Sequence, residues 1–242
     1  MSEGMIAGRN AVAEALKNGR AADTLYLATG ETGGTVGAIV AMCRAQGVVI
    51  KEADQHKLAR LCGSAHHQGV VLSAAAHAYA QLEDLFAAAR EKSEPPFFVI
   101  CDEIEDPHNL GAILRTAEAA GAHGVVVPKR RSAPLSVTVA RASAGAVEYI
   151  PVARVPNLPA AMERLKDAGL WIYGADTLGE PYDRKKLEGP VALVIGSEGR
   201  GLGRLVRERC DVLLALPMKG RVNSLNASVA AGILLYEIAK HR

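Results

Sequence analysis

Residues 191–201 read Val191-Ala192-Leu193-Val194-Ile195-Gly196-Ser197-Glu198-Gly199-Arg200-Gly201, an apolar run that opens onto a polar loop with three glycines. A second apolar run, Leu213-Leu214-Ala215-Leu216-Pro217-Met218, opens onto the polar segment 219–228. Short apolar runs followed by such loops predict buried strands of an α/β sheet, and ligands bind at the carboxyl edge of such sheets. We therefore expect Glu198, Ser224 and Asn226 to lie at that edge as candidates for chemistry.

The glycines after the first run do not fit the usual phosphate-binding loops. A GxGxxG dinucleotide loop through Gly199 and Gly201 would need a third glycine where the chain has Arg204. A nucleoside-triphosphate loop that began at Gly196 would need a lysine where the chain has leucine. A loop with an acidic residue followed by GxGxG, another common nucleotide-binding pattern, is also missing after Cys101. A ligand that contains a nucleoside would therefore need a site of another architecture.

The alternation of apolar runs and amphipathic segments predicts an α/β protein with two domains. Short strands and helices over residues 5–72 predict a small α/β domain at 1–74. The breaker Ser93-Glu94-Pro95-Pro96 ends a linker that we place at 75–96. The second domain, 97–242, should form a mostly parallel sheet with helices on both faces.

The individual elements follow from apolar spacing and from helix and strand punctuation. We expect strands at 25–27, 48–50, 70–72, 97–101, 124–127 and 171–173. We expect helices at 5–18, 35–46, 54–61, 135–145, 158–168 and 226–240. A further helix should be capped by Asn109, carry Leu110, Ile113, Leu114 and Ala117 on one side, and end at Gly121.

The two loops resemble motifs two and three of the SpoU/TrmH family of RNA 2′-O-methyltransferases. Motif one has its counterpart upstream, in Asp106-Pro107-His108-Asn109-Leu110-Gly111-Ala112-Ile113-Leu114-Arg115-Thr116-Ala117-Glu118-Ala119-Ala120-Gly121. The three motifs occur in family order, and the resemblance covers most of residues 97–242. The opening segment, Met5-Ile6-Ala7-Gly8-Arg9-Asn10-Ala11-Val12-Ala13-Glu14-Ala15-Leu16, resembles the small RNA-binding domain of the bacterial large-subunit rRNA guanosine 2′-O-methyltransferases.

The resemblance implies a fold and a cofactor. A small L30e-like RNA-binding domain would precede a SPOUT-like methyltransferase domain with a C-terminal trefoil knot, which no periodicity could predict because knots are very rare. S-adenosylmethionine would lie bent in the knot cleft, held largely by backbone groups. The matching positions are Gly196, Leu216, Met218 and Leu225, which would otherwise be interpreted as strand and loop packing.

The resemblance also implies a catalytic set made of Asn109, Arg115, Glu198, Ser224 and Asn226. Arg115 would grip RNA phosphate and stabilise alkoxide charge, because a guanidinium stays protonated and makes a poor base. Glu198 would orient Arg115 or Asn109, or accept the proton. Ser224 would touch the reacting ribose, and Asn226 would hold the loop or the cofactor. The structural alternatives are an exposed arginine, a loop carboxylate and helix caps.

Composition limits the other classes of function. The net charge of +2 gives no whole-chain argument for nucleic acid, but basic residues gather at 129–131, 200–209 and 219–221, beside the motifs. Four widely spaced cysteines indicate reduced thiols, and we expect no metal site. No apolar run is long enough for a bilayer and no secretory signal is visible, so we expect a cytoplasmic protein without membrane contact.

We therefore expect S-adenosylmethionine-dependent 2′-O-methylation of a guanosine ribose in 23S, large-subunit, ribosomal RNA. The family resemblance also implies a homodimer. The alternatives are a tRNA ribose 2′-O-methyltransferase of the same family and a non-catalytic RNA-binding protein that kept the fold. The intact set of five polar residues argues against the last.

Overall fold

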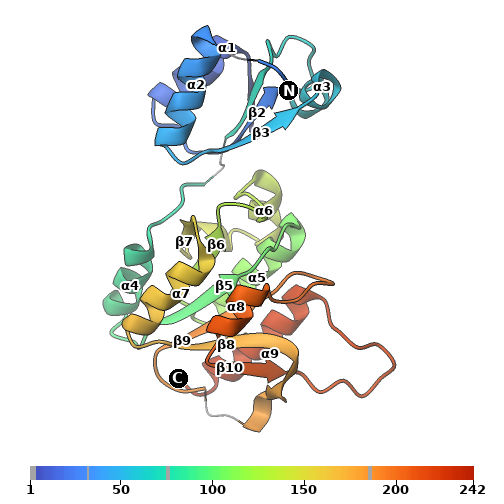
Figure 1. Cartoon of the computed structure of the whole chain (residues 1–242). Coiled ribbons are helices and arrows are strands. Elements are labelled where there is room, and N and C mark those ends of the chain that lie inside the picture. Colours follow the sequence, from blue (N-terminus) through green and yellow to red (C-terminus); the bar gives the residue numbers. More distant parts are fainter. Residues whose placement is uncertain (1–3, 32, 75–76, 185–186) are drawn as a thin grey trace. The chain divides into compact units, whose positions relative to one another are not determined.

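The structure, a computed structural model, describes residues 4–31, 33–74, 77–184 and 187–242. The chain divides into two compact units (Figure 1). The first consists of Met1–Ala78 with Pro134–Val137, and the second of Tyr79–Ala133 with Thr138–Arg242. The first unit carries a four-stranded sheet and the second a six-stranded sheet.

The first unit is a mixed sheet with helices on both faces. Its strands lie in the order β1-β4-β2-β3, with the bounds β1 (Met5–Ala7), β2 (Ala22–Ala28), β3 (Val49–Ala53) and β4 (Val70–Ala74). Its helices are α1 (Arg9–Lys17), α2 (Gly34–Ala45) and α3 (Gln55–Cys62). Leu16 and Ile39 pack with Leu25 of β2 in one core, whereas Leu58 packs with Val71 in the other.

The helix predicted at 5–18 is wrong at its start, because Met5–Ala7 form β1. Ile6 lies opposite Leu72 in an antiparallel pair with β4. Gly8 separates β1 from α1 with a φ of 95°, a conformation that glycine adopts readily and other residues avoid. A three-residue apolar run fits helix and strand equally well, so the pairing partner decides its structure.

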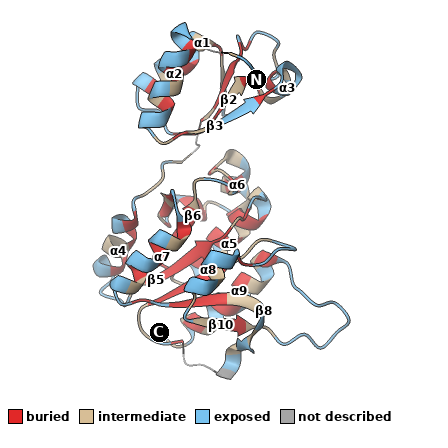
Figure 2. Cartoon of the chain, viewed as in Figure 1, coloured by how far each residue is buried: buried red, intermediate tan, exposed pale blue. Residues whose placement is uncertain are grey.

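The second unit is built on a parallel sheet in the order β10-β8-β9-β5-β6-β7. Its strands are β5 (Phe97–Cys101), β6 (Gly124–Pro128), β7 (Val152–Val155), β8 (Trp171–Pro181), β9 (Val191–Ile195) and β10 (Val212–Ala215). Each neighbouring pair of these strands runs parallel, which confirms the predicted sheet type. The central strands β5 and β9 are buried along their whole length (Figure 2).

Helices cover both faces of this sheet. They are α4 (Leu82–Glu91), α5 (Pro107–Ala119), α6 (Val137–Ala142), α7 (Leu158–Asp167), α8 (Arg204–Arg209) and α9 (Ala227–Ala239), with short 3-10 turns η1 (Ala146–Glu148) and η2 (Tyr182–Arg184). Leu85 of α4, Met162 of α7 and Val206 of α8 share one core with Phe98 and Ile100 of β5. Helices α5 and α9 pack against each other and contact β6 and β9 respectively.

Helix α4 lies inside the segment predicted as a linker, 75–96, of which residues 75–76 fall outside the described residues. Leu82 and Leu85 of α4 are buried in the core of the second unit. The helix starts with a capping box, in which Gln81 and Asp84 bond each other's backbone. The apolar face of α4 is therefore part of the second compact unit, whereas the domain boundaries at 74 and 97 stay predictions.

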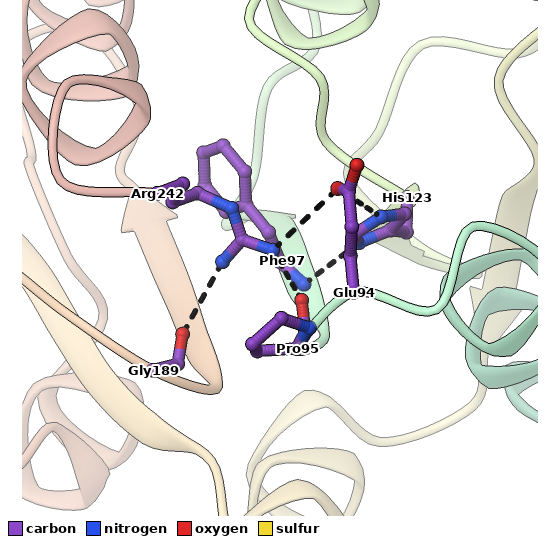
Figure 3. A network of polar contacts seen from close by, with 6 residues as sticks. All are labelled: Glu94, Pro95, Phe97, His123, Gly189 and Arg242. Carbon is purple, nitrogen blue, oxygen red and sulfur yellow. Dashed lines mark hydrogen bonds and ion pairs between the residues drawn. The ribbon is translucent and has the colours of Figure 1, made fainter.

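The amino edge of the parallel sheet is held by Arg242. Its guanidinium donates hydrogen bonds to the carbonyl oxygens of Pro95 and, at 3.2 Å, Gly189 (Figure 3). It also lies 5.1 Å from the centre of the Phe97 ring, at the start of β5. These contacts tie the segment after α9 to the segments that lead into β5 and β9.

His123 lies beside this arginine, at the start of β6, and its side chain is fully buried (Figure 3). Its Nδ1 accepts the backbone N–H of Phe97 at 3.1 Å, which leaves Nε2 to donate to Glu94, also at 3.1 Å. Burial lowers the pKa of His123, the positive charges of Arg242 and Lys92 lower it further, and Glu94 opposes them. The buried ring is therefore held in its neutral form.

Candidate active site

Three loops lie side by side at the carboxyl edge of the parallel sheet. They follow β9, β5 and β6, which are neighbours in the sheet. The carboxylate of Asp102, directly after β5, accepts the backbone N–H of Gly203 at 2.7 Å. The backbone N–H of Ala133, after β6, donates to the carbonyl oxygen of Ile104 at 2.8 Å. The loop after β5 is thus bonded on both sides, and the three form one surface.

One residue from each of the three motifs meets at this edge, in what we call the Asn–Glu–Asn cluster: Asn109, Glu198 and Asn226. The Nδ2 of Asn226 donates to Oδ1 of Asn109 at 3.0 Å and to Oε1 of Glu198. The Nδ2 of Asn109 donates to the same Glu198 oxygen at 3.1 Å. Asn109 is only 9% exposed, so its amide depends on these partners.

Asn226 also caps α9. Its Oδ1 accepts the backbone N–H groups of Ser228 and Val229 at 2.9 and 3.3 Å, and the hydroxyl of Ser228 at 2.6 Å. The amide oxygen therefore fixes the helix while the amide nitrogen faces the cluster. The helix cap given as the structural alternative is therefore present, and the other end of the same amide bonds residues of the other two motifs.

The prediction that Asn109 caps a helix is wrong. Helix α5 begins at Pro107 and is capped by Asp106, whose Oδ1 accepts the N–H of His108 at 2.7 Å. Asn109 lies in the first turn and uses its side chain in the cluster. The pair Asp106-Pro107 could have predicted this helix start, since an acidic or small polar residue directly before proline is typical of one.

Two further residues of the predicted catalytic set, Arg115 and Ser224, make no hydrogen bond or ion pair with the described residues of the cluster. Arg115 is exposed on α5, and Ser224 is exposed in the segment before α9. Among the described residues, neither side chain has a hydrogen bond or ion pair with another. The structure therefore brings together three of the five residues, and the catalytic roles of all five stay predictions.

Gly196, a predicted cofactor position, directly follows β9, where the loop folds back on itself. Ser197 and Gly201 exchange backbone hydrogen bonds of 3.1 and 2.9 Å across the loop. A Cβ atom at position 196 would lie 2.3 Å from the backbone carbon of Gly201. Glycine is thus required at this position for the loop that carries Glu198 to close.

The remaining cofactor positions, Leu216, Met218 and Leu225, follow β10. Residues 217–225 form no helix or strand, and within the described chain their backbone makes no hydrogen bond to another segment. Met218 and Leu225 are 38% and 41% exposed. The segment therefore offers apolar side chains and unbonded N–H and C=O groups, the combination that suits a ligand with a flat apolar ring and a few polar groups.

Asp102 was missed by the sequence analysis. Burial raises its pKa, the N–H of Gly203 lowers it, and the neighbouring Glu103 raises it. Its role is to hold the loop after β9 against the loop after β5. In the described part of the chain, no group of three or more His, Cys, Asp or Glu side chains could hold a metal ion. None of the described helices has the length and apolar character to cross a bilayer.

Comparison with known proteins gives two family matches. The model of the SpoU rRNA Methylase family matches residues 96–236, and the model described as RNA 2'-O ribose methyltransferase substrate binding matches residues 5–80. The chain is 51% identical over 239 residues to a TrmH family tRNA/rRNA methyltransferase of Bacillus subtilis (strain 168). That alignment covers 98% of this chain and 95% of the relative.

Two solved structures illustrate the range of similar proteins. An AdoMet-bound rRNA methyltransferase from Sinorhizobium meliloti is 29% identical, with a TM-score of 0.61 over 98% of this chain and 87% of that one. A protein described for the 2-OH methylation of C/U34 on tRNA is 27% identical, with a TM-score of 0.56 over 61% of this chain and 96% of that one. The similar proteins thus include ones that act on rRNA and on tRNA.

Proposed function

Because this chain belongs to the SpoU rRNA methylase family and is an RNA methyltransferase of the TrmH type, we propose that it methylates the 2′-hydroxyl of a guanosine ribose in 23S ribosomal RNA. S-adenosylmethionine is the proposed donor. The observation that carries this proposal is the Asn–Glu–Asn cluster, in which the three motif segments meet. The match of residues 5–80 to a substrate-binding domain supports an RNA substrate.

The segment after β10 fits S-adenosylmethionine. An adenosine moiety needs apolar walls and a few backbone hydrogen bonds, and residues 217–225 offer both. We propose that Leu216, Met218 and Leu225 hold the cofactor together with the closed loop at Gly196. When bound, the cofactor supplies a methyl group already activated on sulfur, so the chain needs no covalent intermediate.

The residues of the chain then have three tasks in the reaction. They position the ribose hydroxyl, accept its proton and stabilise the charge that develops on its oxygen. Glu198 is our candidate acceptor, and the two amides that bond its Oε1 orient it. Asn109 and Asn226 act in this scheme as positioning residues, and Ser224 as a contact to the ribose.

Arg115 stabilises the alkoxide in our proposal, although it is exposed on α5 and bonds no described residue of the cluster. A homodimer fits this, since family members pair through the catalytic domain and one protomer can complete the RNA site of the other. Val229, Ile233 and Tyr236 of α9 are exposed large apolar residues and are our candidate dimer contacts. Exposed apolar residues that recur along one helix are typical of interfaces.

Other parts of the proposal rest on the family alone. We infer an L30e-like first domain that selects the RNA, a trefoil knot that shapes the cofactor site, closeness to the RlmB branch of the family, and cytoplasmic rRNA processing. A tRNA substrate is the second candidate, because the similar proteins include one described for tRNA methylation.

Methyl transfer from labelled S-adenosylmethionine to purified 23S rRNA and tRNA tests the proposal. We expect label in 2′-O-methylguanosine of 23S rRNA, without added divalent metal. Label in tRNA alone would replace the proposed substrate. Binding of cofactor and RNA without any transfer, under conditions where a known family enzyme is active, would favour the non-catalytic alternative.

A further inference from the structure

Two groups of basic residues in the second unit differ in their ion pairs. Those on α8 are paired: Arg204 with Glu208 at 2.9 Å, Arg207 with Asp176 at 3.3 Å, and Arg209 with Glu163 at 2.6 Å. The cations in the loops that follow β6, β9 and β10, Arg131 apart, have no carboxylate partner among the described residues. They are Lys129, Arg130, Arg200, Lys219 and Arg221.

The absence of acidic partners for these five cations, within the described part of the chain, is informative. The chain has 26 acidic residues for 28 basic ones, so partners are plentiful overall. Mutual repulsion disfavours a concentration of uncompensated positive charge unless an anion is bound there. The edge that carries the Asn–Glu–Asn cluster is thus also the edge where positive charge remains available.

The loop after β6, residues 129–133, is fixed next to the loop that leads into α5. Arg131 donates to Glu103 at 2.6 Å, and the N–H of Ala133 donates to Ile104 at 2.8 Å. Arg131 has a φ of 55°, which is uncommon for a residue other than glycine. One of three consecutive cations is therefore used to hold the loop, and its neighbours Lys129 and Arg130 are left without an acidic partner.

We propose that Lys129 and Arg130 bind phosphates of the RNA strand beside the target nucleotide, and that Arg131 is the positioning residue that holds them there. This inference rests on the proposed function for the identity of the RNA. Such contacts fix the register of the strand without reading its sequence. Arginine suits this role because its planar fork can bond two phosphate oxygens at once.

The test compares two double variants of the full chain that lose equal charge. Lys129→Ala with Arg130→Ala removes the unpaired cations, and Arg204→Ala with Arg209→Ala removes paired ones. Affinity for a 23S rRNA fragment is measured over a range of salt concentrations, with S-adenosylmethionine affinity as a check on the fold. We expect the first variant to bind RNA about tenfold or more weakly, and its logarithmic salt slope to fall by about 1 to 2.

The control variant should keep the salt slope of the unmodified protein. Equal weakening in both double variants would show a general charge effect and overturn the proposal, as would unchanged binding in the first. These outcomes concern RNA binding alone. A protein that bound RNA as expected but transferred no methyl group would contradict the proposed function and leave this inference standing.

A charge swap tests the positioning role of Arg131. Arg131→Glu should raise KM for RNA several-fold with little change in kcat, because it releases the loop without touching the Asn–Glu–Asn cluster. Adding Glu103→Arg should restore KM by reversing the ion pair. Failure of the swap to restore KM, or a normal KM in Arg131→Glu, would remove Arg131 from the proposal.

Discussion

The two edges of the parallel sheet use the same kinds of residue in opposite ways. At the amino edge, the guanidinium of Arg242 is bonded to two carbonyl oxygens, and the ring of His123 is buried between Phe97 and Glu94. At the carboxyl edge, five cations have no acidic partner among the described residues, and residues 217–225 have no backbone partner there. One edge stabilises the fold, and the other keeps polar groups available for a ligand.

This difference follows from the direction of the strands. In a parallel sheet all strands end at one edge, so the loops that follow them gather there. At the opposite edge, the segments that lead into the strands only cover the core. We therefore expect substitutions at the carboxyl edge to change methyl transfer, and substitutions at the amino edge to change the free energy of unfolding.

Arg115→Ala should give the largest effect. We expect methyl transfer to fall by about 100-fold or more, because the donor for developing negative charge is lost. Arg115→Lys should fail as well, since lysine lacks the planar fork. Cofactor affinity, measured by calorimetry, and the melting temperature should not change, because Arg115 is exposed. Near-normal turnover in Arg115→Ala would remove it from the reaction.

Gly196→Ala should distort the loop that carries Glu198. The new Cβ would lie 2.3 Å from the backbone of Gly201, which cannot move cheaply. We expect a loss of about 1–3 kcal/mol in the free energy of unfolding, as in other overpacked sites, together with slower methyl transfer. Gly37→Ala in α2 is the matched control, because a Cβ there meets nothing within 4 Å and the residue lies outside the proposed site. Equal behaviour of the two variants would contradict the account of this loop.

Arg242→Ala tests the amino edge. Hydrogen bonds to charged groups contribute about 1.5–3 kcal/mol each, so we expect a lower melting temperature and lower resistance to urea. The control is Lys240→Ala, because this side chain is 69% exposed and exposed ion pairs contribute little. The kcat for methyl transfer at 25 °C should stay unchanged. A fall in kcat without a fall in stability would mean that the two edges are not separate in function.

His123→Asn should give the smallest effect on methyl transfer, and its diagnostic effect is on the pH dependence of stability. The pKa of His123 is lowered in the folded protein, so the unfolded chain takes up its proton first as the pH falls. Stability should therefore decrease below a pH of about 6.5, the usual histidine value. Asparagine can still accept the Phe97 N–H but does not titrate. Urea unfolding at pH 7 and pH 5 should show a smaller loss in the variant than in the unmodified protein.

Local sequence patterns were enough to predict the buried strands β5 and β9 and helix α5 of the second unit. Five consecutive apolar residues mark β5 and β9, and the spacing of Leu110, Ile113 and Leu114 marks α5. These elements were predictable because strand length and helical period are properties of neighbouring residues. The short β1 was not predictable in this way, since its strand character comes from pairing with β4.

The sequence named the three residues of the Asn–Glu–Asn cluster as candidates, but it could not predict their contacts. Glu198 and Asn226 follow apolar runs, and the family resemblance drew attention to Asn109. The bond from Gly203 to Asp102 joins residues 101 positions apart, and the bond from Asn226 to Asn109 joins residues 117 apart. No local pattern reports contacts of that range, because the order of the strands decides which loops become neighbours.

A double-mutant cycle on Asn109→Ala and Glu198→Ala tests the central claim most directly, namely that residues of separate motifs act as one catalytic unit. The single-turnover rate of methyl transfer is measured for both single variants and for the double variant. We predict that each single variant is slowed at least tenfold and that the double variant is no slower than the slower single one, since groups that act together are not additive. Rate losses that multiply in the double variant, or single variants that react normally, would contradict the account.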